Sequence, residues 1–224
     1  MLKVGLTGGI ASGKSAVGEM FVKLGAHLIQ SDDVAHRLLE PGQTVYDEVV
    51  RRFGNSILSP DGAISRPKLA EAAFGRAAEG SGTAEAPRVQ ELNAIVHPAV
   101  IAQENKWMEG MGTRDSEAIA IVEAALILEA RAADRFDYLV VVTCRPEQRI
   151  ERLARRLGIS EEAARAEVMR RMAAQIPEEE KIRAADFVID NSGSLESTEQ
   201  QVRKVFAVLR PTPPLAINKT TPCH

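Results

Sequence analysis

Cysteine, excess positive charge and long apolar runs are all scarce in this sequence, and each scarcity excludes a class of protein. The 224 residues contain two cysteines, Cys144 and Cys223, which give neither a disulfide framework nor the spacing of a metal site. The formal net charge is −3, so no overall positive field would hold nucleic acid or an anionic membrane. No apolar run approaches the roughly 20 residues of a membrane span, and no signal-peptide pattern precedes the first predicted strand, so we expect a cytoplasmic protein.

A glycine-rich loop near the N-terminus carries the clearest chemical signal. Residues 8–15 fit the pattern G-x-x-x-x-G-K-[ST] and directly follow the apolar residues 2–6 of a predicted strand. In such a phosphate-binding loop, backbone N–H groups face a polyphosphate, Lys14 reaches its β and γ phosphates, and the Ser15 hydroxyl can bind Mg²⁺. The predicted nucleotide-binding residues of this segment are Gly8, Gly9, Ala11, Ser12, Gly13, Lys14, Ser15 and Ala16.

Two carboxylates follow the second predicted strand, at 27–29. Asp32 and Asp33 come after Gln30 and Ser31, and open α/β sheets bind ligands at the carboxyl ends of their strands. One of the two aspartates could therefore act as a general base. The alternative is that both aspartates only cap the helix that begins there, for which Ser31 or Asp32 could be the capping residue.

Strands alternate with helices along the whole chain. This alternation predicts an α/β fold, with a parallel sheet, right-handed crossovers and helices on both faces, which is the architecture of P-loop proteins. Further strands are predicted at 118–122, 138–143 and 187–189, and helices at 14–24, 44–53, 66–74, 159–175, 177–185 and 194–209.

The middle of the chain contains a predicted loop and a predicted helix break. Residues 75–87 are rich in Gly, Ala, Glu and Ser without periodicity, which is typical of an exposed loop. The long helical region after them is expected to break or restart at His97-Pro98, because proline is tolerated in the first turn of a helix. Such a break would place His97 at a helix start, where it is either functional or a packing residue.

Residues 145–156 form an arginine-rich segment with five arginines and two glutamates. Arg149, Arg152 and Arg156 recur at i, i+3 and i+7, so they share a helical face and could clamp phosphoryl oxygens as part of a lid. A solvated face with Glu–Arg pairs is the alternative. Glu123, at the end of the strand at 118–122, could hold Mg²⁺ through water or lie at the surface.

Several motifs, in this order, resemble those of the dephospho-coenzyme A kinases. They occupy residues 5–15, 29–32, 40–42, 92–98 and 185–193, and read GLTGGIASGKS, IQSD, EPG, LNAIVHP and ADFVIDNSG. The resemblance runs from about residue 2 to 209. It implies a P-loop kinase fold of the nucleotide-kinase type with helical substrate-binding and lid subdomains. Residues 1–209 would form a single kinase domain with an acceptor-binding insertion at about 44–112 and a lid at about 145–183. Residues 210–224 are predicted to be a disordered tail.

The resemblance also implies a reaction, in which ATP, with Mg²⁺, phosphorylates the ribose 3′-hydroxyl of dephospho-coenzyme A. Asp32 matches the base that receives the hydroxyl proton, and Lys14 and Arg156 would offset phosphoryl charge. The predicted residue sets are catalytic Asp32, Lys14 and Arg156; ATP-binding Arg149 and Arg152 besides the loop; acceptor-binding Asp32, His97 and Glu129; and metal-binding Ser15 and Glu123.

The sequence departs from the family pattern at four positions. Gln30 and Ser31 stand where the strand-two motif has Asp and Ala, and His36 stands where arginine is common. Gln30 can hydrogen-bond but carries no charge. Ala11 replaces a loop glycine, and we expect it to have a negative φ.

Other functions remain open at this point. Another nucleotide or small-molecule P-loop kinase would keep the loop and the lid but need different acceptor contacts. A GTP-dependent switch would need an Asn/Thr-Lys-x-Asp motif after a strand, and Asn218-Lys219-Thr220 lies in the tail. A non-catalytic nucleotide-binding module is favoured only by Gln30. The expected partners are ATP and dephospho-coenzyme A, without nucleic acid or membrane, for a monomer or weak homo-oligomer.

Overall fold

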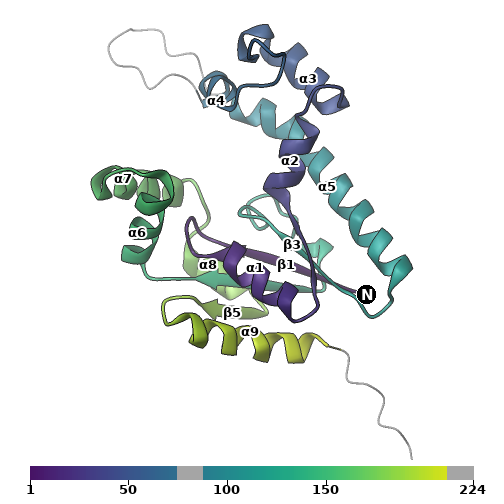
Figure 1. Cartoon of the computed structure of the whole chain (residues 1–224), viewed down its shortest axis with the longest axis vertical. Coiled ribbons are helices and arrows are strands. Elements are labelled where there is room, and N and C mark those ends of the chain that lie inside the picture. Colours follow the sequence, from purple (N-terminus) through teal and green to yellow (C-terminus); the bar gives the residue numbers. More distant parts are fainter. Residues whose placement is uncertain (75–87, 211–224) are drawn as a thin grey trace, which may run out of the picture. The chain divides into compact units, whose positions relative to one another are not determined.

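The computed structural model describes residues 1–74 and 88–210. The predicted loop at 75–87 and all but the first residue of the predicted tail lie outside these residues. Figure 1 shows the elements, and at least one helix lies between each strand and the next along the chain. They are β1 (Leu2–Gly8), α1 (Lys14–Lys23), β2 (His27–Gln30), α2 (Ser31–Leu38), α3 (Thr44–Phe53), η1 (Asn55–Ile57), α4 (Arg66–Phe74), α5 (Val89–Arg114), β3 (Ile119–Glu123), η2 (Ala133–Arg135), β4 (Tyr138–Thr143), α6 (Pro146–Leu157), α7 (Glu161–Ala173), α8 (Glu178–Ala184), β5 (Phe187–Asp190) and α9 (Leu195–Leu209).

The chain forms two compact units. The first contains Met1–Leu28, Asp115–Ile121 and Ala125–His224, and the second contains Ile29–Arg114 and Val122–Ala124. The predicted helical insertion at 44–112 falls inside the second unit, and the predicted lid at 145–183 falls inside the first. No helix among residues 1–74 and 88–210 is long and apolar enough to cross a membrane.

A five-stranded parallel sheet in the order β2-β3-β1-β4-β5 confirms the predicted fold class. Its registers align the strand ends, because Gly8 pairs with Val142 and Val142 pairs with Ile189. The segments that follow β1, β4 and β5 therefore leave the sheet at one edge. The predicted interior positions of 118–122 and 138–143 are also confirmed, since β3 and β4 each have neighbours on both sides.

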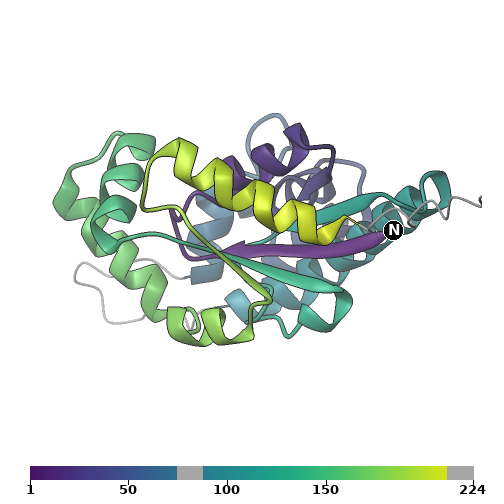
Figure 2. The same ribbon diagram turned by 90° about the horizontal axis from the view of Figure 1, so that it is seen from below.

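Apolar side chains of the sheet, α1 and α9 form the core of the first unit. Phe21 of α1 and Phe206 of α9 contact each other with ring centroids 6.5 Å apart. In Figure 2, α9 lies on one side of the strands and the light-green α8 lies on the other, as expected for helices on both faces. The buried core residues are Val4, Leu6, Val17, Met20, Phe21, Ala26, Ile119, Ile121, Val140, Val142, Ile189, Val202, Val205, Phe206 and Leu209.

Helices α6 and α7 pack on each other through a small apolar cluster. Its buried members are Ile10, Ile150, Leu153, Ala164 and Val168, so the cluster joins the phosphate loop to the predicted lid. The start of α7 follows the sequence, since Ser160 is the N-cap and its side chain accepts a hydrogen bond from the Ala163 N–H.

The second unit consists mainly of α2 to α5, and α3 and α4 have the predicted bounds. The prediction of a break at His97-Pro98 is wrong, because α5 runs unbroken from Val89 to Arg114 with Pro98 inside it. Proline removes one helical hydrogen bond, but Val96 and Val100 on either side of it are buried. Packing of this face keeps the helix continuous, as tertiary contacts do for most helices in proteins.

Candidate active site

The phosphate loop connects β1 to α1 at the sheet edge described above. Gly13 is the N-cap of α1 with φ 93°, and Lys14 is the first helical residue. The Lys14 ammonium donates hydrogen bonds to the carbonyl oxygens of Gly8, at 2.9 Å, and Gly9, at 3.1 Å. It thus lies over the loop, near the N-terminus of α1, where an anion is stabilised.

The prediction of a negative φ at Ala11 is wrong, because Ala11 has φ 53°. This left-handed conformation costs an L-residue about 1–2 kcal/mol, so the surrounding structure must hold it. The Ala11 carbonyl accepts hydrogen bonds from the Cys144 thiol, at 3.8 Å, and from the Arg152 guanidinium, at 3.5 Å. Cys144 is buried, and burial raises the pKa of its thiol.

Arg152 and Asn191 fix the loop at Ser12. Arg152 donates from Nη1 to the Ser12 carbonyl, at 3.1 Å, and from Nη2 to the Asn191 carbonyl, at 2.9 Å. Asn191, which directly follows β5, donates to the same Ser12 carbonyl at 2.9 Å and accepts from Thr198 of α9. The loop is therefore anchored to the ends of β4 and β5. The Arg152 guanidinium already lies beside the loop, where a bound polyphosphate would be placed.

Arg149 lies deeper than Arg152, with a side chain only 1% exposed. Its guanidinium donates to the Cys144 carbonyl and forms an ion pair with Glu178 of α8. It also lies against Gly9, where an added Cβ would overlap it. Gly9, Arg149 and α8 line a cavity of about 40 Å³, which suits a water molecule rather than a nucleotide, since small-molecule pockets measure roughly 300–1,000 Å³.

The three arginines of the predicted clamp differ in their surroundings. Arg149 is buried, Arg152 is half-buried, and Arg156 is exposed in the last turn of α6. The row therefore leads from the base of the loop to solvent. Arg149 and Arg152 both touch the phosphate loop, whereas the clamping of phosphate by Arg156 stays a prediction.

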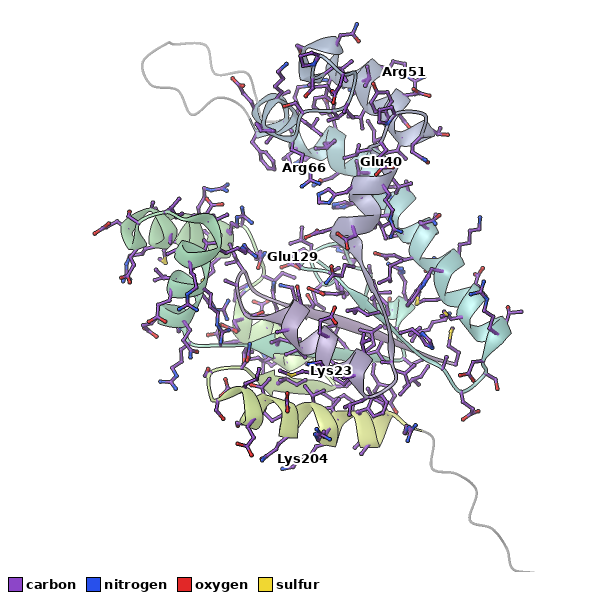
Figure 3. All side chains as sticks on the ribbon, viewed as in Figure 1. Lys23, Glu40, Arg51, Arg66, Glu129 and Lys204 are labelled. Atoms are coloured by element: carbon purple, nitrogen blue, oxygen red, sulfur yellow. The ribbon has the colours of Figure 1, made fainter. Side chains whose placement is uncertain are left out.

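Glu129, labelled in Figure 3, is part of a second ion pair of α8. It binds the Lys181 ammonium at 2.7 Å and accepts from the Ile176 N–H at 3.2 Å, while Lys181 also donates to Gln175. The Lys181 side chain is 3% exposed, so this pair ties α8 to the segment after β3. Its role as an acceptor-binding residue stays a prediction.

Asp32 lies in the second unit, in the first turn of α2, and is exposed. The alternative that Ser31 or Asp32 caps this helix is wrong, because Gln30 is the N-cap residue and Ser31 is already helical. The side chains of Gln30 and Ser31 bind carboxylates instead. Gln30 Nε2 donates to Glu123 Oε2 at 2.9 Å, and Ser31 Oγ donates to Glu104 Oε1 at 2.5 Å.

The other predicted residues of the second unit are Glu123 and His97. Glu123 ends β3 and is 8% exposed, so the alternative of a surface carboxylate is wrong. His97 is half-buried inside α5, seven residues before Glu104 and hence on nearly the same helical face. Among the described residues, no group of three or more His, Cys, Asp or Glu side chains is placed so that it could hold a metal ion.

Sequence reasoning missed Asn191, Glu178 and Glu104. Asn191 follows a predicted strand, and that position at the sheet edge could have identified it. Glu178 lies in an acidic first turn and Glu104 lies within a long helix, so the local sequence gives neither of them a partner.

Comparison with known proteins matches the chain to one family. A family model described as dephospho-CoA kinase matches residues 2–197. A dephospho-CoA kinase of Streptomyces avermitilis is 41% identical over 93% of this chain and 94% of its own length. One from Aquifex aeolicus is 38% identical, over 95% of this chain and 100% of its own length.

Two solved structures share the fold. A protein from Thermus thermophilus superposes with a TM-score of 0.73 at 30% identity, over 94% of this chain and 98% of its own. Dephospho-CoA kinase from Campylobacter jejuni superposes with a TM-score of 0.58 at 24% identity, over 93% of this chain and 97% of its own.

Proposed function

The chain belongs to the dephospho-CoA kinase family, and from this premise we propose that it transfers the γ-phosphoryl group of ATP to the ribose 3′-hydroxyl of dephospho-CoA. The products are CoA and ADP. The family match over residues 2–197 carries the proposal, because it includes both the phosphate loop and Asp32.

On the donor side, the residues of the loop bind the ATP phosphates through backbone N–H groups and through Lys14. Binding requires Lys14 to exchange its bonds with the Gly8 and Gly9 carbonyls for bonds with phosphate oxygens. Arg152 is already adjacent to the loop, and Arg149 and Arg156 extend the positive row. Their charges offset the charge that spreads over the phosphoryl oxygens during transfer.

On the acceptor side, Asp32 orients the hydroxyl group and accepts its proton. Its carboxylate is exposed, and both neighbours on its N-terminal side are fixed by hydrogen bonds. His97 and Glu129 are the further acceptor contacts in this proposal. Closure of the lid would exclude water, which otherwise competes with the acceptor for the phosphoryl group.

Mg²⁺ belongs to the proposal, and the donor chemistry fits it. This ion prefers oxygen ligands and commonly takes only one or two from protein, the rest coming from water and substrate phosphates. The Ser15 hydroxyl and the Glu123 carboxylate supply such oxygens, and they would hold the ion. When bound, Mg²⁺ neutralises charge on the β and γ phosphates. The cytoplasmic location and the oligomeric state stay predictions from the sequence.

Release of ADP from ATP tests the reaction, measured with dephospho-CoA, without an acceptor and without Mg²⁺. We expect ADP only when both the acceptor and the metal are present. Equal ADP release without the acceptor would identify an ATPase. Faster release with another nucleoside or small-molecule alcohol would indicate a different kinase of the same fold.

Replacement of Asp32 tests the base. Asp32→Asn keeps the size of the side chain but removes its basicity, so kcat should fall by roughly 10²–10⁴ while KM for ATP changes little. Asp33→Asn is the matched control, because Asp33 is the next residue and is also exposed. Near-normal turnover of Asp32→Asn would remove Asp32 as the base and leave the family assignment intact.

A further inference from the structure

Two buried carboxylates accept hydrogen bonds from the residues directly before Asp32. Glu104 is 2% exposed and binds the Ser31 hydroxyl, and Glu123 is 8% exposed and binds the Gln30 amide. All five residues belong to the second unit. Each of the two residues before the proposed base is thus held by a hydrogen bond to a buried carboxylate.

Glu104 is an unusual residue for its position. It lies in the buried row of α5, where Val96 and Val100 are eight and four residues before it and Met108 is four residues after it. An apolar side chain at such a position needs no hydrogen bond, whereas a buried carboxylate loses its hydration and is stable only when it is hydrogen-bonded. The presence of a carboxylate at this buried position is therefore explained by its hydrogen bond to Ser31 rather than by packing.

The Ser31–Glu104 bond reaches across 73 residues and joins two helices that pack on each other. Its length of 2.5 Å is that of a hydroxyl bound to a carboxylate, which is stronger than a bond between neutral groups. Ser31 is the first residue of α2 and Asp32 the second. A bond at Ser31 therefore restrains the turn from which the Asp32 carboxylate projects.

We propose that Glu104 is a positioning residue which, through the Ser31 hydroxyl, fixes the first turn of α2 and so orients Asp32 toward the acceptor hydroxyl. Gln30 and Glu123 form the second attachment of the same turn. Both donors are neutral, so neither of them adds a positive charge beside Asp32. The inference rests on the proposed function for the role of Asp32, although the attachment itself does not.

The kinetic test compares Ser31→Ala with Ser31→Thr, and Glu104→Leu with Glu109→Leu. Ser31→Ala and Glu104→Leu should lower kcat at saturating ATP and dephospho-CoA by roughly 10-fold, with KM for ATP unchanged. Ser31→Thr keeps a hydroxyl and should retain kcat. Glu109→Leu is the matched control, because Glu109 lies on the same helix and is exposed.

A second comparison separates positioning from a loss of stability. In the Asp32→Asn background, Ser31→Ala should have no further effect on kcat, since there is no base left to orient. An equal 10-fold loss in both backgrounds would overturn the proposal, because it would show a general structural defect. Unchanged kcat in Ser31→Ala and Glu104→Leu would also overturn it.

Amide hydrogen exchange tests the attachment whatever acceptor the enzyme uses. Ser31→Ala should speed exchange at residues 31–38 of α2 by about 10-fold relative to residues 44–53 of α3. Unchanged exchange in α2 would overturn the proposal even in a protein without activity on dephospho-CoA. Faster exchange with unchanged kcat would overturn the positioning role. Failure of the proposed function would appear separately, as absence of ADP release by the wild type.

Discussion

The two units hold their functional segments with opposite kinds of side chain. In the first unit, cations bind backbone oxygens of the phosphate loop, with Lys14 on Gly8 and Gly9 and Arg152 on Ala11 and Ser12. In the second unit, neutral donors bind buried carboxylates beside Asp32. Cationic side chains hold the first segment, and a neutral amide and a neutral hydroxyl hold the second.

The difference matches what each segment must do in the proposed reaction. Cations that bind carbonyl oxygens can exchange them for phosphate oxygens, which are the stronger acceptors. A base, in contrast, must be fixed without being neutralised, and hydroxyl or amide donors achieve this. Variants in the first unit should therefore change ATP binding and turnover together, whereas those in the second should change turnover alone.

The largest effect in the first unit is expected for Lys14→Ala. Loss of the ammonium should lower kcat by roughly 10²–10³ and raise KM for ATP, because Lys14 stabilises phosphate charge in both the ground state and the transition state. Lys23→Ala is the control, since Lys23, labelled in Figure 3, is an exposed lysine at the other end of α1. Unchanged turnover of Lys14→Ala would contradict the assignment of the loop as the donor site.

Gly13→Ala should be the next most damaging change. Gly13 has φ 93°, and a Cβ would overlap the Asn191 side-chain amide, so we expect a loss of about 2–4 kcal/mol in the free energy of unfolding. Gly25→Ala isolates the backbone part, because Gly25 has φ 105° and a Cβ there would meet no described atom within 4 Å. The free energies of unfolding of both variants, measured with denaturant, would differ by the contribution of the contact with Asn191. Equal losses of free energy would show that Asn191 does not fix the loop.

A smaller effect of opposite sign is expected for Ala11→Gly. Glycine relieves the left-handed strain of about 1–2 kcal/mol but adds freedom to the unfolded chain, so the net gain in unfolding free energy should be about 0.5–1 kcal/mol. Ala16→Gly, in the first turn of α1, should instead lose about 0.5–1 kcal/mol. A loss of stability in Ala11→Gly would contradict the strain inferred from φ 53°.

The smallest effect is expected at a surface ion pair of α7. The Arg170 guanidinium, with Arg171, lowers the pKa of Glu167 to about 2. A lowered pKa in the folded state stabilises the protein above the ordinary value of 4.5, and this stabilisation is lost as the pH falls toward 2. Glu167→Gln should cost at most about 1 kcal/mol at pH 7, with Glu162→Gln as the control on the same helix. Thermal unfolding at several pH values measures this cost. If the loss of stability caused by Glu167→Gln did not become smaller below pH 4.5, the ion pair would not be its source.

Much of the fold could be predicted because its signals are local. The bounds of α3, α4 and β4 follow from apolar spacing, and Ser160 and Ser194 start their helices as capping residues. The phosphate loop is a short motif in which each residue type has a chemical role. Such features depend only on residues close together in the chain, so the sequence by itself determined them. The order of the motifs in the sequence likewise indicated the family.

Tertiary structure decided which side chains meet. Glu178 reaches Arg149, and Glu104 reaches Ser31 across 73 residues. It also kept α5 continuous through Pro98 and held Ala11 at a positive φ, against the local preference at both positions. The physical reason is that burial and contacts with distant residues can outweigh a local cost of 1–3 kcal/mol, and the local sequence does not record those contacts.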